Sequence, residues 1–192
     1  MTQLWVDTET TGINEYKDSI VQLAVMVVVD NEIKEERNWN LKPYRPKGMD
    51  PEAAAATGLT QEIVDAFPDQ SIAFREFREL LDKYEIGKKD RAYFCGYNVN
   101  FDLQFVKEWF QENGYFDLFR KVYTPCIDVM YWAAVPFILK GIRAQMKNFK
   151  LGTVYETLFN EPLESAHNAM ADIKGTYRIY NVLVDKYFPE TR

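Results

Sequence analysis

The feature that most constrains the fold is an early succession of extended segments. The segment from Ile20 to Asp30 is rich in valine, isoleucine and leucine, which is typical of a buried strand. The segments from Gln3 to Asp7 and from Glu32 to Leu41 also read as strands, and Asp30-Asn31 provides the turn chemistry of a hairpin. The sequence therefore predicts three successive strands at the start of the chain.

After residue 50, strands alternate with helices. Pro51 suits the first turn of a helix that Asp50 caps and Gly58 ends. The further predicted elements are a helix from Ser71 to Tyr84, a strand from Arg91 to Tyr97, a helix from Phe101 to Glu112, a strand from Val122 to Ile127, a helix beginning near Asp128 and a helix from Asn168 to Lys186. We expect an α/β fold in which a mixed sheet has helices on its faces, and a single domain over residues 1–192.

Composition limits the partners and the compartment. A net charge of −6 and a pI near 5.0 do not favour nucleic-acid binding by overall charge, unless the acids gather where divalent cations neutralise them. No segment approaches the ~20 apolar residues of a membrane helix, and no secretion signal is visible. Cys95 and Cys126 lack metal-ligand spacing. We expect them to be reduced core thiols in a cytoplasmic protein that does not contact a membrane.

The first candidate site is the sequence from Val6 to Gly12, which contains Asp7 and Glu9. Residues two apart on a strand point to the same face, so these two carboxylates project together where the strand ends. Two like charges repel unless a cation lies between them, and carboxylate oxygens suit Mg²⁺ or Mn²⁺. A solvated strand end is the simpler explanation of this motif taken alone.

Two further acids stand at helix starts. Asp102 follows a predicted strand directly and lies in the first turn of a helix, where the helix dipole favours a carboxylate. His167, the only histidine, precedes Asp172 by five residues at the start of the last helix. Each position has a structural explanation of its own, since Asp102 could merely stabilise its helix and most lone histidines are surface or core groups.

Taken together, the three motifs resemble those of the DEDDh exonucleases, the family that includes the proofreading subunit of bacterial DNA polymerase III. D-x-E-x-T-G, N-x-x-F-D and H-x-x-x-x-D occur in the family's order and at its intervals. Met49 to Thr60 also looks like the stretch before the family's second helix, and the resemblance spans about Gln3 to Leu183. It implies the ribonuclease H-like fold, a mixed five-stranded sheet flanked by helices.

The resemblance also implies a mechanism. Asp7, Glu9, Asp102 and Asp172 would hold two divalent cations, Mg²⁺ or Mn²⁺, with Asp7 bridging them, and His167 would act as the general base toward the attacking water. Nucleoside 5′-monophosphates would leave from a free 3′ end of single-stranded DNA. The residues implied as substrate contacts are Thr10, Thr11, Gly12, Asn98 and Phe101.

Basic residues away from these motifs are candidates for phosphate contacts. They are Lys140, Arg143, Lys147 and Lys150 in one stretch, and Arg45 and Lys47 in an earlier loop. Solvated surface charge explains any one of them equally well.

Other functions share parts of this pattern. An exonuclease that trims RNA 3′ ends or degrades oligoribonucleotides would use the same five catalytic residues. A catalytically inactive nucleic-acid-binding scaffold would have lost at least one of them, and none is lost. The H-x-x-x-x-D motif argues against an endonuclease of the ribonuclease H type. The sequence continues for only about five residues beyond the last predicted helix, which favours a stand-alone enzyme. It leaves a polymerase partner and the oligomeric state open.

Overall fold

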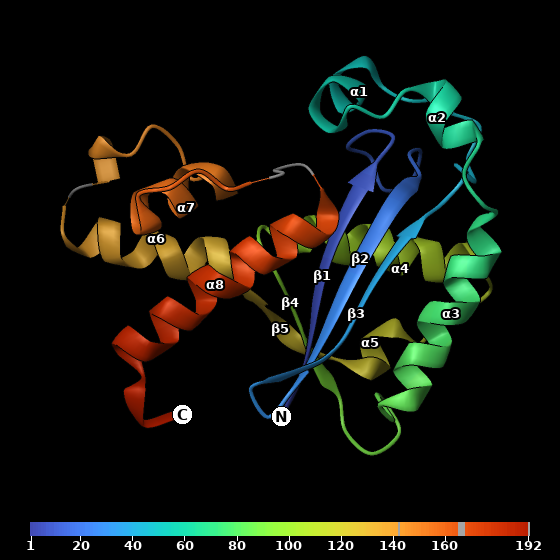
Figure 1. Cartoon of the computed structure of the whole chain (residues 1–192). Coiled ribbons are helices and arrows are strands. Elements are labelled where there is room, and N and C mark those ends of the chain that lie inside the picture. The colour runs from blue at the N-terminus through green and yellow to red at the C-terminus, as the bar shows by residue number, and fades with distance from the viewer. Residues whose placement is uncertain (142, 165–167, 192) are drawn as a thin grey trace.

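The computed structural model describes residues 1–141, 143–164 and 168–191. Its centre is a five-stranded sheet of β1 (Thr2–Thr10), β2 (Ile20–Val29), β3 (Glu32–Asn40), β4 (Ala92–Gly96) and β5 (Val122–Asp128), in the order β3-β2-β1-β4-β5 (Figure 1). β1, β2 and β3 pair antiparallel, whereas β4 runs parallel to β1 and β5 parallel to β4. The predicted mixed five-stranded sheet is confirmed.

The helices cover both faces and one end of this sheet (Figure 1). They are α1 (Pro51–Thr57), α2 (Gln61–Asp65), α3 (Gln70–Lys83), α4 (Asn100–Glu112), α5 (Leu118–Lys121), α6 (Val129–Leu139), α7 (Leu151–Phe159) and α8 (Ala169–Tyr187), with 3₁₀ turns η1 (Arg143–Gln145) and η2 (Pro189–Thr191). Asp50 caps α1 by accepting from the Glu52 amide, and Gly58 ends it with a φ of 72°, as predicted. In the described ranges, none of the helices combines the length and apolar character needed to cross a bilayer.

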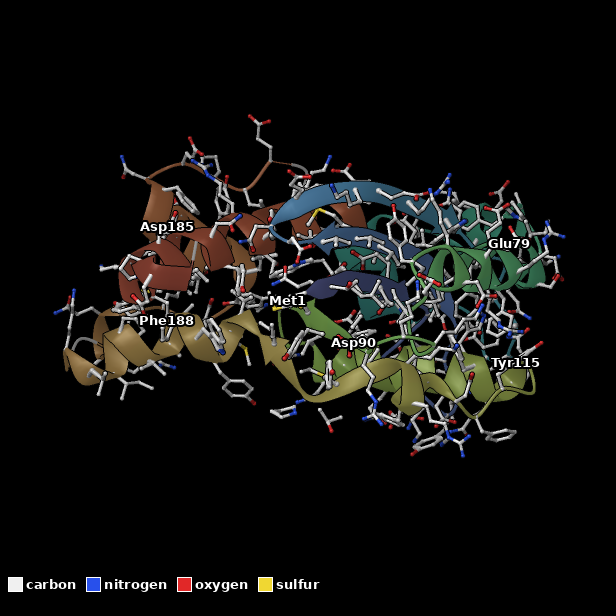
Figure 2. All side chains as sticks on the ribbon, turned by 90° about the horizontal axis from the view of Figure 1, so that it is seen from below. Met1, Glu79, Asp90, Tyr115, Asp185 and Phe188 are labelled. Atoms are coloured by element: carbon white, nitrogen blue, oxygen red, sulfur yellow. The ribbon has the colours of Figure 1, made fainter. Side chains whose placement is uncertain are left out.

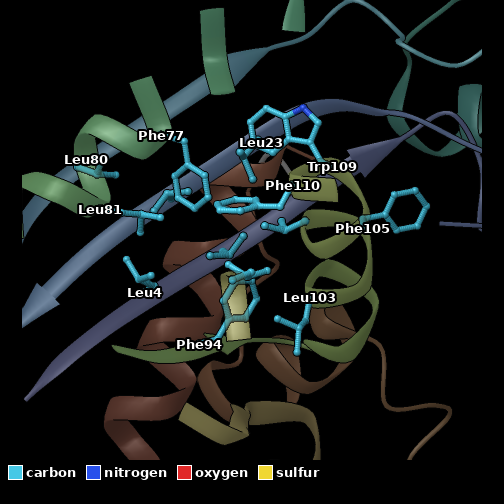
Figure 3. Close-up of a cluster of buried hydrophobic side chains, with 14 of the residues drawn as sticks. Leu4, Leu23, Phe77, Leu80, Leu81, Phe94, Leu103, Phe105, Trp109 and Phe110 are labelled. Carbon is cyan, nitrogen blue, oxygen red and sulfur yellow. The ribbon is translucent and has the colours of Figure 1, made fainter. Parts of the chain in front are cut away.

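One face of the sheet packs on α3 and α4 through large apolar side chains. Phe77 of α3 stacks on Trp109 of α4 at 6.2 Å, and both are fully buried (Figure 3). Leu4 and Val6 of β1 belong to the same cluster. Each such side chain contributes roughly 1.5–3 kcal/mol when fully buried. β1 is therefore fixed firmly along the half that precedes Asp7.

The opposite face packs mainly on α8. Trp5 of β1 meets Tyr177 and Tyr180 edge-on at 5.1 and 5.0 Å. Tyr180 is buried, but Tyr187, seven residues later at the end of α8, is 43% exposed. The cause is position, because the last turn of α8 extends beyond the strands (Figure 1).

The helix α6 carries no charged residue and still faces solvent over much of its surface. Tyr131, Val135 and Ile138 are all at least half exposed. Figure 2, seen from below, shows Phe188 beside α6, where its ring lies 6.1 Å from that of Trp132. An apolar groove of about 600 Å³ runs between α6 and the end of α8.

Candidate active site

The site lies where β1 extends beyond the end of its parallel neighbour, β4. β4 pairs with β1 only from Gln3 to Trp5, whereas β1 continues to Thr10 in contact with β2. The last residues of β1 therefore have one open edge. Asp7 and Glu9 share one face of this segment, and Thr8 points to the other.

Asp102 occupies the open edge of β1. It lies in the first turn of α4 and is 3% exposed. Its Oδ1 accepts hydrogen bonds from both the backbone amide and the hydroxyl of Thr8, each at 2.8 Å. The carboxylate thus takes the place of a neighbouring strand and ties the start of α4 to β1, between Asp7 and Glu9.

Asp172 reaches the same strand end from the other face. It lies in the first turn of α8, whose N-cap Asn168 accepts from the Ala171 amide at 3.2 Å. Carboxylate oxygens of Asp7, Glu9 and Asp172 all lie within 4.8 Å of one another. Three of the four predicted metal ligands therefore meet in one group, and Asp102 stands beside it with one oxygen directed to Thr8.

These carboxylates raise one another's pKa values. Burial, followed by the charges of Asp102, Asp172 and Glu9, raises the pKa of Asp7 well above its usual value. Burial, followed by the charges of Asp172 and Asp102, raises the pKa of Glu9 to about 8. Burial raises the pKa of Asp102 to about 7, despite the opposing hydrogen bonds from Thr8. The protein by itself holds this group of negative charges at a cost.

A divalent cation fits such a group. Every ligand atom that it offers is a carboxylate oxygen, and hard oxygen donors suit Mg²⁺ or Mn²⁺. The like charges that raise the pKa values are those that a cation would neutralise. The predicted base, His167, lies outside the described residues.

A cavity of about 420 Å³ opens beside Glu9. It is lined by Thr8, Glu9, Thr10, Gly12, Ile13, Asp50, Glu52, Ala53, Ala56, Thr57 and Phe101. Thr10, Gly12 and Phe101, predicted as substrate contacts, are thus in its wall. Ile13 is 87% exposed at its rim. The sequence predicts the helix α1 correctly, but it gives no sign that residues of α1 line the site.

Two other predicted substrate contacts lie elsewhere. Thr11 is fully buried, its hydroxyl accepts from the Ser19 amide at 2.9 Å, and its carbonyl accepts from the Asp50 amide at 2.7 Å. It fixes α1 to the end of β1 rather than facing the cavity. Asn98 is exposed, with a φ of 55°, and does not line the cavity.

Gly12 has a steric role next to Thr11. A Cβ on Gly12 would lie 2.6 Å from Oδ2 of Asp18, a fully buried carboxylate. Asp18 accepts from the Asn14 amide at 2.9 Å and pairs with the Lys47 ammonium at 2.7 Å. This packing fixes the turn that forms one rim of the cavity.

The basic residues of the earlier loop form ion pairs within the protein. Lys47 neutralises Asp18, and the Arg45 guanidinium, 7% exposed, pairs with Glu112 at 3.1 Å and donates to the Glu15 carbonyl. The prediction of phosphate contacts at Arg45 is therefore wrong, because its side chain is buried against an acid far away in the sequence. In the later stretch, the side chains of Lys140, Arg143, Lys147 and Lys150 are exposed.

Comparison with known proteins agrees with this geometry. The profile of the family described as RNase_T, an exonuclease, matches residues 4–180. A PolC-type DNA polymerase III of Bacillus cereus is 26% identical over 93% of this chain, which covers 11% of that protein. Ribonuclease T of Shewanella frigidimarina is 24% identical over 95% of this chain and 81% of its own length. The chain thus spans about a tenth of its polymerase relatives.

Solved structures show the same fold. The zinc-bound complex of Escherichia coli ExoI with single-stranded DNA superposes with a TM-score of 0.77 at 24% identity, over 99% of this chain and 41% of that one. A full-length 3′-exonuclease superposes with a TM-score of 0.67 at 18% identity, over 96% of this chain and 60% of that one. The resemblance to exonucleases and the ribonuclease H-like sheet, both predicted from the motifs, are confirmed.

Proposed function

The chain belongs to the exonuclease family, and from this premise we propose that it removes nucleoside 5′-monophosphates from the 3′ end of a single DNA strand. The observation that carries the proposal is the gathering of Asp7, Glu9 and Asp172 within 4.8 Å at the end of β1. The adjoining cavity offers a place for the terminal nucleotide. We further propose that residues 1–192 act as one domain.

In the proposed reaction, a water oxygen forms a bond to the terminal phosphorus, and the bond from that phosphorus to the 3′ oxygen of the next nucleotide breaks. His167 takes the proton of the water, and the departing oxygen is protonated to a new 3′-hydroxyl. Two bound divalent cations, Mg²⁺ or Mn²⁺, would neutralise the carboxylates and stabilise charge on the attacking and leaving oxygens. Asp7, Glu9, Asp102 and Asp172 would hold them.

Single-stranded DNA is the substrate that the structural neighbours favour, because the E. coli ExoI structure contains it. RNA is a second candidate, favoured by the likeness to ribonuclease T over most of that protein's length. A cytoplasmic location belongs to the same proposal, and the free thiols Cys95 and Cys126 suit a reducing compartment.

Direction and substrate can be tested together with DNA and RNA single strands that carry a label at either the 5′ or the 3′ end. With Mg²⁺ or Mn²⁺, we expect the 5′-labelled strand to shorten one nucleotide at a time. The 3′-labelled strand should release a labelled mononucleotide at once. A labelled mononucleotide appearing first from the 5′-labelled strand, or products ending in a 3′-phosphate, would contradict the proposal.

The roles of the residues need matched variants. Asp7→Ala should abolish both activity and metal binding, whereas His167→Ala should lower turnover about 10²–10⁴-fold and leave metal binding intact. Glu62→Gln, at an exposed acid of α2, is the control and should behave as the wild type. Near wild-type turnover in either site variant would exclude the mechanism.

A further inference from the structure

We propose that Asp128 is a positioning residue for Asp102, acting from the end of the neighbouring strand on the turn that leads into α4. The inference rests on the proposed function, because it assigns to Asp102 a place at the metal site. It gives Asp128 a role beyond that of the N-cap of α6.

The helix α4 starts without a side-chain cap of its own. The residue before it is Val99, with helical backbone angles and no side chain that can accept a hydrogen bond. By contrast, Asp69 caps α3 and Asn168 caps α8. The first amides of a helix need acceptors from outside the helix. The helix that carries Asp102 therefore depends on another part of the chain at its start.

Asp128 supplies an acceptor just before the helix, on the turn that leads into α4. Its Oδ1 accepts from the Asn98 amide at 3.0 Å and from the Met130 amide at 3.0 Å. The residue is only 7% exposed, so water competes little for these bonds. The Asp128 carboxylate thus accepts hydrogen bonds from the start of α6 and from the turn that connects the neighbouring strand β4 to α4.

The turn between β4 and α4 is also restrained at its β4 end. Gly96 pairs with Asp128 in the sheet, and a Cβ on Gly96 would lie 2.9 Å from the Val6 carbonyl. Asn98 adopts a left-handed conformation, with φ 55°. The turn is therefore held between β5 and the strand that bears Asp7.

These bonds form a continuous connection into the metal site. Asp128 holds Asn98, one turn before Asp102, and Asp102 in turn accepts both hydrogen bonds from Thr8. If the bond to Asn98 is lost, the start of α4 can shift, and the carboxylate of Asp102 moves relative to Asp7 and Glu9. Outer groups that orient metal ligands typically change affinity or activity about 10–100-fold.

The variant Asp128→Ser should separate the two contacts of this carboxylate, the cap of α6 and the bond to the Asn98 amide. Serine is a good N-cap and can serve α6, but its hydroxyl is one bond shorter and does not reach Asn98. Asp69→Ser makes the same change at the cap of α3, away from the site. Asp128→Asn restores an oxygen at full length and is the rescue variant.

The readouts are Mn²⁺ binding followed by electron paramagnetic resonance, the thermal midpoint, and kcat and KM. We expect Asp128→Ser to keep a thermal midpoint close to that of Asp69→Ser, to bind Mn²⁺ about 10-fold more weakly and to lose kcat about 10-fold or more. KM should change little, and Asp128→Asn should recover most of the loss.

Wild-type Mn²⁺ binding in Asp128→Ser, or a loss that Asp128→Asn does not rescue, would overturn the positioning role. If the wild-type protein binds Mn²⁺ and degrades no nucleic acid, the proposed function fails instead. The Mn²⁺ comparison would then still decide the role of Asp128.

Discussion

Thr8 lies between Asp7 and Glu9 on β1, and both its backbone amide and its hydroxyl donate hydrogen bonds to Asp102. We expect Thr8→Val, which keeps the shape but lacks the hydroxyl, to lower the free energy of unfolding by about 1.5–3 kcal/mol, because a hydrogen bond to a buried charge is lost. Activity should fall about 10–100-fold. Urea denaturation and turnover measure the two effects.

Thr8→Ser is the matched control, since it retains the hydroxyl. It should keep most of the activity. Equal losses in Thr8→Val and Thr8→Ser would show that the hydroxyl does not hold Asp102.

Burial, followed by the charges of Asp102, Asp172 and Glu9, raises the pKa of Asp7. In a chelator at pH 8, we expect Asp7→Asn to unfold at a higher temperature than the wild type, because one of several crowded charges is gone. The gain should be about 2–4 °C for each kcal/mol of relieved repulsion. Added Mg²⁺ should raise the thermal midpoint of the wild type only. A variant less stable than the wild type in chelator would contradict the charge argument.

The sequence predicted which residues gather at the end of β1 better than it predicted their contacts. The order and spacing of the motifs and their resemblance to the family singled out Asp7, Glu9 and Asp172, whose carboxylates the structure brings together. Their role as metal ligands stays a prediction. The burial of Arg45 could not be found, because its partner Glu112 is 67 positions later and no local pattern connects them. The Thr11 contacts were missed as well, since its hydroxyl accepts from the amide of Ser19, which directly precedes β2.

At the scale of elements, the long helices α3, α4 and α8 were predicted to within a few residues, whereas α2, α5 and α7 were not predicted. α3, α4 and α8 have apolar faces that match the helical repeat. α2 and α5 have five and four residues, too short for a repeat to appear. β1 was predicted to end at Asp7 but continues to Thr10, because the acids and threonines of its last part are held by Asp102 and β2.

The helix α1 forms one wall of the cavity but has no buried residue. Its attachment includes the bond from the Asp50 amide to the Thr11 carbonyl. We expect its amides to exchange with solvent at least ~100-fold faster than those of β2, since weakly packed elements open locally. Hydrogen exchange followed by mass spectrometry or NMR measures this directly.

Asp50→Ala should speed exchange in α1 further, because the loss of a cap costs a helix about 1 kcal/mol. Exchange in β2 should stay unchanged. Equal protection of α1 and β2 would mean that α1 is part of the rigid frame.

At the scale of the whole molecule, the carboxylate group sets how stability depends on pH. The pKa of Glu9 is raised to about 8 and that of Asp102 to about 7. A raised folded-state pKa stabilises the fold below the unfolded-state value and loses that contribution as pH rises through the folded one. The metal-free protein should therefore lose stability between about pH 5 and pH 8.

Thermal midpoints in chelator across this pH range test the expectation. Saturating Mg²⁺ should abolish most of the decline, because a bound cation offsets the deprotonated carboxylates. A midpoint that rises steadily from pH 5 to pH 8 in chelator would contradict it.

The crowding of Asp7, Glu9 and Asp172 also bears on how descendants of such a chain can change. If the proposed function holds, replacing one of these acids by its amide would end catalysis and, in the metal-free protein, would relieve repulsion at the end of the central strand. A duplicated gene freed from selection for activity would gain in folding by that step. Lineages that retain the fold and lose the acids should therefore arise readily from such a chain.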